Sequence, residues 1–316
     1  MKKRIEAVRD RLHVGLVIAR VVHSYAQEIS LANQFIPVGF LPLRHLFSHR
    51  ESFALLARYF GDAWTLRKNN PRVIPEACSL GHSVMDRAGR TSDLIVDEDS
   101  APYPPSTTFR LEELSVEGFS SLMRIERGRV RNREVFGSMR LEYGFFRLKA
   151  RHANYLVAKD ESRIVGAIGF TLSPAEGTVK VFELIALTDR VIHFLFSALE
   201  RKCSEKEGVE YIEIDVSAHA PRMQRTLLGL NFIPAAYIPA MVFHEVERLD
   251  IIKMVRLCRL QDLGPLELSP QVEGMVNRVM RGFRSRTVIP RIARAVSRIP
   301  LFQGLNTEQV TRLAGV

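Results

Sequence analysis

The chain has 316 residues, of which 46% are apolar and 25% charged, and its formal net charge is +10. This length exceeds what one hydrophobic core usually serves, so we expect about two domains of an ordinary globular protein. No apolar run is long enough to cross a membrane, and the charged first residues lack the apolar core of a secretory signal. The three cysteines are widely separated, which argues against a disulfide framework and a cysteine-rich zinc site. We therefore expect a cytoplasmic protein without a bound metal.

The first predicted elements are a charged helix, a strand, a second helix and a second strand, followed by a helix that leaves the sheet, called here the exit helix, which begins at Pro75.

A shift of 197 positions places residues 27–42 over residues 224–239 with six identities in sixteen positions. About one identity is expected by chance. A similar exit helix begins at Pro270. We infer an internal duplication, in which residues 1–88 are the C-terminal half of a first copy. This half-copy either comes from a longer chain or borrows a partner surface.

Residues 89–108 are rich in glycine, proline and aspartate and predict a surface connector between the copies. A strand at 109–114 and helices at 116–129 and 134–150 are expected next. The remaining elements are a hairpin at 154–159 and 164–172, a strand at 177–187, a helix at 191–203, a strand at 211–216, a helix at 221–230 and a strand at 232–242. This order predicts an α/β domain over residues 109–262, with a mixed sheet, flanking helices and right-handed parallel crossovers.

Three stretches of this domain carry a resemblance to a known superfamily: 155–170 with its Val-Gly-Ala-Ile-Gly run, 211–216, and Asn-Phe-Ile-Pro-Ala-Ala-Tyr at 231–237. Together they resemble the GNAT acyl-CoA N-acyltransferases. The resemblance implies a GNAT-like sheet at 109–262 and an N-terminal half-copy of the same unit. It also implies acetyl-CoA or a longer acyl-CoA as substrate, with an amine of unknown identity as acceptor.

In that fold the pantetheine arm lies between two parallel strands, and the pyrophosphate lies at the start of the following helix. The resemblance places the pantetheine along residues 179–187. The cofactor-binding candidates are Ile185, Leu187, Thr188, Arg190 and Val191. The turn at 186–192 has no glycine where the superfamily has a glycine-rich turn, and Asp189 adds a negative charge there. We expect Arg190 to replace part of the missing phosphate contacts.

The catalytic candidates are Glu183, His219 and Tyr237. Glu183 falls on the strand where the superfamily places a general base, although it could also be a solvent-facing strand residue. The superfamily's tyrosine acid corresponds to Leu227 here, which leaves Tyr237 as a substitute or as a core aromatic. His219 follows a strand end, where it could act in the site or be structural.

Seven arginines and no acidic residue lie between Val276 and Pro300, six of them in a basic helical linker at 263–296. Such a segment packs on its neighbours or binds a lipid, nucleic-acid or acidic protein surface. The scarcity of aromatic residues disfavours nucleic acid as the partner.

Residues 297–316, with Ile-Pro-Leu-Phe and a helix capped by Asn306 or Thr307, resemble the start of a cyclic-nucleotide-binding domain. This implies a cyclic nucleotide bound by a module that continues beyond residue 316.

The leading hypothesis is therefore an acyl-CoA-dependent acyltransferase, with transfer to an amine nitrogen, in a nucleotide-regulated multidomain protein. The alternative is a non-catalytic GNAT-like sensor or scaffold, which the missing glycines and tyrosine favour. A third hypothesis is a nucleic-acid or membrane-surface binder that acts through residues 278–298.

Overall fold

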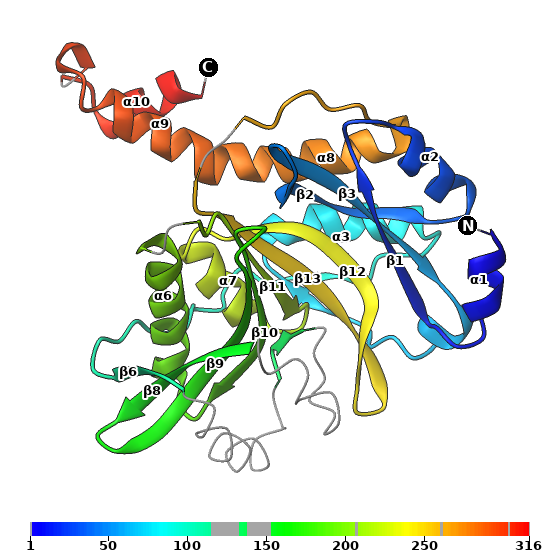
Figure 1. Ribbon diagram of the computed structural model, residues 1–316, viewed down its shortest axis with the longest axis horizontal. Helices are drawn as coiled ribbons and strands as arrows, with labels where there is room; N and C mark the ends of the chain where they lie inside the picture. The colour runs from blue at the N-terminus through cyan, green and yellow to red at the C-terminus, as the bar shows by residue number, and fades with distance from the viewer. Residues whose placement is uncertain are drawn as a thin grey trace.

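The computed structural model describes residues 2–114, 133–137, 153–205, 208–259, 262–302 and 304–315. Within these ranges eleven strands form one mixed sheet, and α-helices pack against it (Figure 1). The strands of the sheet are β1 (Val14–Arg20), β2 (Ile36–Leu46), β3 (Arg50–Tyr59), β6 (Arg110–Glu113), β7 (Val135–Phe136), β8 (Ala153–Asp160), β9 (Arg163–Ser173), β10 (Thr178–Ala186), β11 (Tyr211–Ser217), β12 (Ile233–His244) and β13 (Glu247–Leu257). The α-helices are α1 (Lys2–Val8), α2 (Tyr25–Ala32), α3 (Pro75–Arg87), α6 (Asp189–Glu205), α7 (Pro221–Gly229), α8 (Pro270–Phe283), α9 (Ile289–Val296) and α10 (Thr307–Ala314). The expected mixed α/β sheet with flanking helices is confirmed.

The strand order along the sheet is β1-β3-β2-β12-β13-β11-β10-β9-β8-β6, with β7 paired to β11 outside this path. Strands β8, β9 and β10 form an antiparallel meander. Helix α6 then connects β10 to the parallel strand β11. Strand β13 inserts between β11 and β12, so the strand at 232–242 does not close the sheet as the sequence suggested. The equivalent strand of the half-copy, β3, was likewise not predicted.

The half-copy joins the second copy through β2 and β12, which are paired at Gly39 and Ala236. These two positions are 197 residues apart, so they correspond in the aligned stretches 27–42 and 224–239. A Cβ atom added to Gly39 would lie 2.2 Å from Cβ of Ala236 and 2.5 Å from the carbonyl oxygen of Ala235. Only glycine therefore allows the two equivalent strands to approach this closely.

The two segments related by the 197-residue shift also share unusual backbone conformations. Gln34 and Asn231 have φ angles of 62° and 63°, and Leu43 and Ala240 have φ angles of 51° and 50°. Non-glycine residues rarely adopt positive φ, yet each pair repeats at the same offset of 197 residues. The hairpins β2–β3 and β12–β13 also carry register shifts at equivalent places. The two segments thus share one local fold.

Helices pack on the sheet around a continuous hydrophobic core. Helices α3 and α8 each contact both β2 and β12 at the junction of the two copies, whereas α6 packs on β8, β9 and β10 (Figure 1). Side chains of α3, α6, α7 and α8 belong to the same cluster of buried residues. The half-copy and the second copy therefore share one core.

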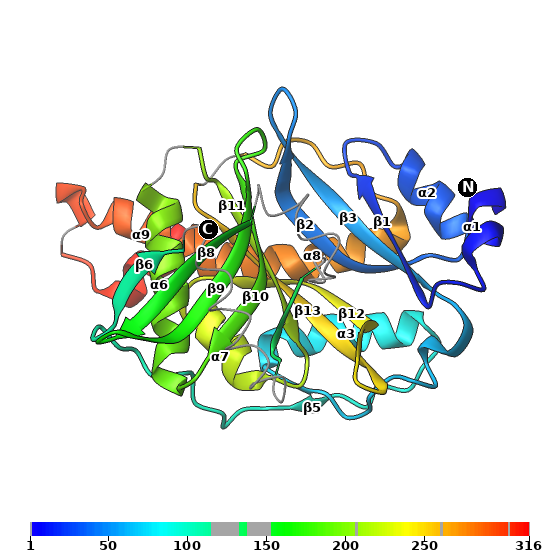
Figure 2. The same ribbon diagram turned by 60° about the horizontal axis from the view of Figure 1, so that its bottom comes forward.

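The connector at 89–108 is more than a surface loop. Strand β5 (Ile95–Val96) pairs with β4 (Arg72–Val73), and the chain then runs along α7 (Figure 2). Asp97 and Tyr103 are buried, with exposed fractions of 2% and 6%. The expectation of a solvent-exposed connector was wrong for these residues, because α7 supplies partners that proline-rich composition does not reveal.

The helix expected at 116–129 lies outside the described residues. The helix expected at 134–150 is described only at 134–137, and there the prediction was wrong, because Val135–Phe136 is the strand β7. The β-branched and aromatic side chains of β7 are both buried, and its backbone pairs with β11. At the C-terminus, Asn306 caps α10, and Gln309 completes a reciprocal capping box.

Candidate functional site

Strands β10 and β11 are paired over only part of their lengths. Their parallel pairing runs from Thr178 with Tyr211 to Val181 with Ile214. At this point β10 has a bulge against β9, between Val181 and Glu183. Beyond it β11 pairs instead with β7. Because a bulge bends its strand, the two parallel strands separate towards their carboxyl ends, and we call this feature the strand divergence.

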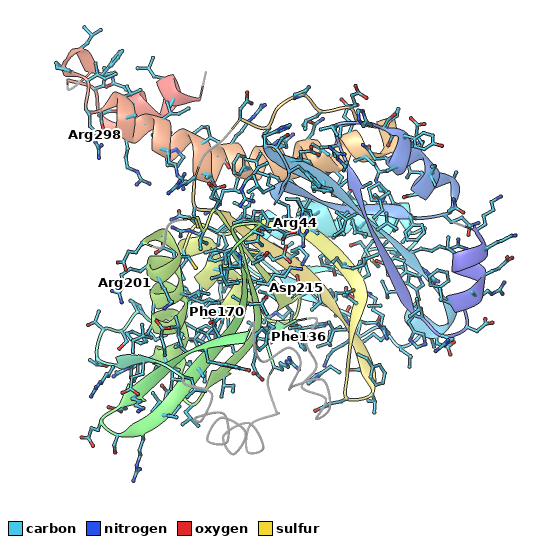
Figure 3. All side chains as sticks on the ribbon, in the orientation of Figure 1. Arg44, Phe136, Phe170, Arg201, Asp215 and Arg298 are labelled. Carbon is cyan, nitrogen blue, oxygen red and sulfur yellow. The ribbon has the colours of Figure 1, made fainter. Side chains whose placement is uncertain are left out.

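Strand β7 lies within the strand divergence, on the β11 side. Asp215 and Val216 of β11 pair with Phe136 and Val135 (Figure 3). The Arg133 guanidinium reaches the carbonyl oxygen of Phe182 at the β10 bulge, at 3.5 Å. The segment 133–137 therefore contacts both separated strands, and Gly137 packs so closely on Phe182 that an added Cβ atom would lie 2.2 Å from the Phe182 Cβ.

The turn that follows β10 leads into the start of α6. Leu187, Thr188 and Arg190 are exposed there, with Leu187 at 52%. Ile185 and Val191 are instead buried in the hydrophobic core, so only their backbone groups are available to a ligand. The five cofactor-binding candidates thus divide into three exposed side chains at the helix start and two core residues beside them.

Asp189, the first residue of α6, forms an ion pair with Arg222 in the first turn of α7. The Arg222 guanidinium donates to an Asp189 carboxylate oxygen at 2.8 Å, and both side chains are partly exposed. This hydrogen bond raises the pKa of Arg222. Asp189 occupies the end of a helix where free N–H groups and the dipole favour an anion. A bound anion would therefore compete with Asp189 for the same positive charges.

Glu183 is buried at the β10 bulge, with 7% of its surface exposed, and is not a solvent-facing strand residue. The Tyr155 hydroxyl donates to its Oε2 atom at 2.7 Å. The Tyr155 ring packs edge-on against Phe182, with 5.5 Å between centroids. The hydroxyl and the aromatic packing hold the carboxylate on the face of the sheet opposite α6.

Tyr237 lies in a closed ionic network away from Glu183. Its hydroxyl donates to Asp250, which also accepts from Arg67 at 2.6 Å and from the backbone N–H of Ala240 at 2.9 Å. Arg67 makes a second bidentate contact with Asp93. Burial, together with Asp250, raises the pKa of Tyr237 well above its usual value. Tyr237 has no exposed surface, so this geometry favours a structural role.

His219 follows the end of β11 and is half-buried. Burial lowers the pKa of its imidazole. Among the described residues its Nε2 atom is buried without a hydrogen-bond partner. No contact within the described ranges joins His219 or Tyr237 to Glu183, so the structure does not assemble the three catalytic candidates into one group.

A second carboxylate lies at the strand divergence and was not found from the sequence. Glu134 immediately precedes β7, and its backbone carbonyl accepts from the N–H of Ser217 at 2.8 Å. Tyr103 donates its hydroxyl to both carboxylate oxygens of Glu134, at 2.9 and 3.0 Å. The ring of Tyr103 lies 4.2 Å from the Arg222 guanidinium. No sequence motif indicated this group, because its members come from the connector, β7 and α7.

A charge cluster of five residues lies where the half-copy meets β10, β11 and β13. Its members are Arg44, Lys180, Glu213, Asp215 and Lys253 (Figure 3). Arg44 of the half-copy donates to Glu213 at 3.0 Å, and Lys180 contacts the other Glu213 oxygen at 2.7 Å. Burial alone would raise the pKa of Glu213, but Lys253, Lys180 and Arg44 outweigh it and lower this pKa to about 2. The half-copy thus supplies a cation to the sheet that carries the candidate site.

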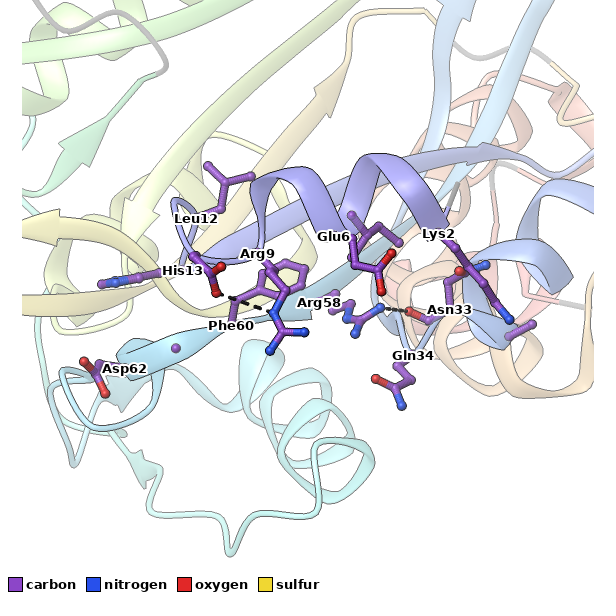
Figure 4. Close-up of a pocket in the computed structure, with 14 residues that line it drawn as sticks. Lys2, Glu6, Arg9, Leu12, His13, Asn33, Gln34, Arg58, Phe60 and Asp62 are labelled. Atoms are coloured by element: carbon purple, nitrogen blue, oxygen red, sulfur yellow. Dashed lines mark hydrogen bonds and ion pairs between the residues drawn. The ribbon is translucent and has the colours of Figure 1, made fainter.

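A cavity of about 810 Å³ lies in the half-copy, between α1, the end of α2 and the end of β3 (Figure 4). Its lining mixes basic side chains such as Arg58 with acidic ones such as Asp62, and includes none of the candidate site residues.

In the part of the chain that the structure describes, no helix is long and apolar enough to cross the membrane. Nor do these residues contain a cluster of three or more histidine, cysteine or acidic side chains suited to a metal ion.

No protein-family model matches the sequence, and no significant match was found among curated proteins. Solved structures of similar fold include spermidine N-acetyltransferase from Vibrio cholerae in complex with CoA and spermine, at 10% identity and a TM-score of 0.40, covering 48% of this chain and 96% of that one. Another is the ribosomal-protein-S18-alanine N-acetyltransferase from Escherichia coli, at 12% identity and a TM-score of 0.41, covering 50% and 98%. A probable acetyltransferase from Staphylococcus epidermidis has 11% identity and a TM-score of 0.38, covering 47% and 98%. Such values leave the reaction of this chain open.

Proposed function

We propose that this chain is an acyl-CoA-dependent acyltransferase that transfers an acyl group to an amine nitrogen. The observation that carries the proposal is the strand divergence, because β10 and β11 stop pairing after Val181 and Ile214. An extended pantetheine arm would run along this side of β10, where Gly137 now packs against Phe182 and would have to move aside. Ligands of open α/β sheets bind at such carboxyl-end crevices.

The turn from β10 into α6 suits the phosphates of CoA. Thr188 and Arg190 are exposed at the start of a 17-residue helix, whose amide groups and dipole attract anions. Arg222 lies beside this helix start, held by Asp189. We infer that pyrophosphate displaces Asp189 from Arg222, which compensates in part for the missing glycines.

Glu183 remains the proposed general base. It is held by Tyr155 on the face of the sheet opposite α6, so a cofactor entering beside α6 and an amine entering from the other face would meet at the bulge. A buried carboxylate near the reacting nitrogen can accept its proton as the new bond forms. We leave Tyr237 outside the catalytic group because it is committed to Asp250.

Calorimetry with a graded series from acetyl-CoA to long-chain acyl-CoA tests this function. We expect saturable binding that weakens in Arg190→Ala, together with release of CoA when a panel of primary amines is supplied. Glu183→Gln should bind acyl-CoA normally and lose turnover by roughly 10²-fold or more. Absence of binding across the whole series would refute the proposal.

A non-catalytic sensor is the second candidate function. Two observations favour it: the turn at 186–192 lacks glycine, and β7 lies within the strand divergence. Acyl-CoA binding without CoA release from any amine would support this candidate. Regulation by a cyclic nucleotide is likewise a proposal, motivated by the turn at Pro300–Phe302 and the capped helix α10.

A further inference from the structure

Helix α8 does not end where its packing on the sheet ends. It runs directly into a π-helical turn (Arg284–Val288) and then into α9, and the residues at both joins have helical backbone angles. The apolar side chains of α8 from Val272 to Phe283 are buried in the shared core, whereas no residue of α9 is buried. Figure 1 shows α9 and α10 extending away from the sheet. We call residues 289–315 the projecting helix pair.

The apolar side chains of the projecting helix pair are only partly covered. Between the two helices, Val310 is buried, and a Cβ atom added to Gly315 would lie 3.6 Å from Cδ1 of Ile289. Helix α10 therefore covers one side of α9. Four aliphatic side chains keep 40% or more of their surface exposed: Ile292, Ile299, Leu301 and Leu313. Several exposed aliphatic side chains on one projection indicate a contact surface.

The same part of the chain carries positive charge that the protein does not neutralise. Four of its arginines are exposed and form no ion pair within the described ranges: Arg281, Arg284, Arg294 and Arg298. By contrast, Arg286 pairs with Glu76, and Arg312 pairs with Glu308. A group of unpaired arginines attracts an anionic partner.

We propose that the projecting helix pair binds an anionic lipid surface. Arg294 and Arg298 contact the negatively charged headgroups, and Ile299 and Leu301 enter the apolar region just below them. Leu301 is only three positions from Arg298, so charged and apolar groups reach the same interface. Basic amphipathic segments bind membrane surfaces through these two contributions together. The inference does not depend on the proposed acyltransferase function.

Lipid fits this surface better than other polyanions do. Single-stranded nucleic acid is held by base stacking on aromatic side chains, and residues 289–315 contain one aromatic residue, Phe302. A phosphate backbone would also leave the exposed aliphatic side chains in water. A strongly acidic protein face has the same disadvantage, because charged residues are depleted in the apolar centre of protein interfaces. Leu301, at 83% exposure, would remain uncovered in both cases.

Flotation of the full chain with lipid vesicles tests the inference. We expect binding to vesicles of phosphatidylcholine and phosphatidylserine in equal parts, none to phosphatidylcholine alone, and weaker binding as salt is raised. The double variant Arg294→Gln, Arg298→Gln should bind roughly 25-fold more weakly, because each arginine at such a surface contributes roughly five-fold. The matched control is Arg163→Gln, Arg201→Gln, which removes two exposed charges from β9 and α6 and should bind normally (Figure 3).

Leu301→Ser tests the apolar contribution at constant charge. It should weaken vesicle binding several-fold, and the loss should persist at high salt, where the arginine contribution is screened. Val246→Ser is its control, because Val246 is 77% exposed in the turn between β12 and β13.

Four results would overturn the inference. They are the absence of binding to the anionic vesicles, equal losses in the two arginine double variants, normal vesicle binding by Leu301→Ser, and tighter binding to a single-stranded RNA or to polyglutamate than to the vesicles. The last result would instead assign the surface to nucleic acid or to an acidic protein. All the substituted side chains are exposed, so each variant should fold normally.

Discussion

Gln27 and Gln224 correspond at the 197-residue shift, and each accepts a hydrogen bond from the backbone just before the helix that follows the other segment, α8 or α3. Gln224 accepts from the N–H of Ile74, just before α3, and donates to the carbonyl of Ser217. Gln27 accepts from the N–H of Ser269, just before α8, and donates to the carbonyl of Arg20. Both glutamines are fully buried. The half-copy and the second copy are therefore tied together by reciprocal contacts.

Replacing Gln224 with leucine should destabilise the fold by about 1–3 kcal/mol, because the buried N–H of Ile74 would lose its acceptor. Gln27→Leu should cost a similar amount through Ser269. Chemical denaturation measures the free energy of unfolding. Gln271→Leu, at an exposed position of α8, is the control and should change it by less than about 0.5 kcal/mol. Equal effects at Gln224 and Gln271 would contradict this account of the junction.

Gly39 offers a second test of the junction. Gly39→Val should destabilise the protein by about 1–3 kcal/mol or more, because its Cβ would overlap Ala236. In Gly282→Ala the added Cβ meets nothing within 4 Å, and α8 should become up to about 1 kcal/mol more stable. Thermal and denaturant unfolding of the two variants should therefore shift in opposite directions. A neutral Gly39→Val would mean that β2 and β12 separate easily.

The sequence was informative where one segment determines its own structure. The apolar spacing of 191–203 and the prolines at 221 and 270 predicted helices at close to their observed bounds. Strand β13 was missed because Asp250 and Lys253 interrupt its apolar pattern, and their partners, Arg67 and Asp215, lie far away in the sequence. The repeat could be recognised in the sequence from its identical residues. The buried hydrogen bonds of Gln27 and Gln224 could be found only in the folded structure.

The sequence predicted only the part of the candidate site that depends on local features. Glu183 could be singled out because its strand and the following helix are local features. Glu134 and Tyr103 could not, because their contact joins residues 31 positions apart across a connector that resembled a loop. Tyr237 was a candidate as a substitute for the tyrosine whose place Leu227 takes, and only the position of Asp250 shows what its hydroxyl binds.

Tyr237→Phe should therefore leave turnover within about two-fold of the unmodified protein while lowering stability by about 1 kcal/mol. The variant removes one donor to Asp250, which keeps its contacts with Arg67 and Ala240. Steady-state kinetics and unfolding should be measured on the same preparations, with Glu183→Gln as the catalytic comparison. A large loss of kcat at unchanged stability would instead place Tyr237 in the chemistry.

The charge cluster predicts an acid-sensitive fold. The pKa of Glu213 falls from 4.5 to about 2, so this group contributes stability that is present above its unfolded pKa. That contribution should decline as the pH falls below about 4.5 and be lost near pH 2. Urea unfolding at several pH values should show a shallower decline in Glu213→Gln over this window. The variant should also be less stable at neutral pH, because Arg44 would be left buried without its carboxylate.

Asp189→Asn should bind acyl-CoA two- to ten-fold more tightly than the unmodified protein. Its carboxylate repels a pyrophosphate at the start of α6 and also engages Arg222, so its neutralisation removes one opposing charge and releases one favourable charge. The gain should diminish as salt is raised, because the partly exposed pair is screened. Asp160→Asn, an exposed residue at the end of β8, is the control for the change in net charge. Calorimetry across a salt series separates the two effects: a local repulsion at α6 changes affinity only in Asp189→Asn, whereas a general charge effect changes it equally in both variants.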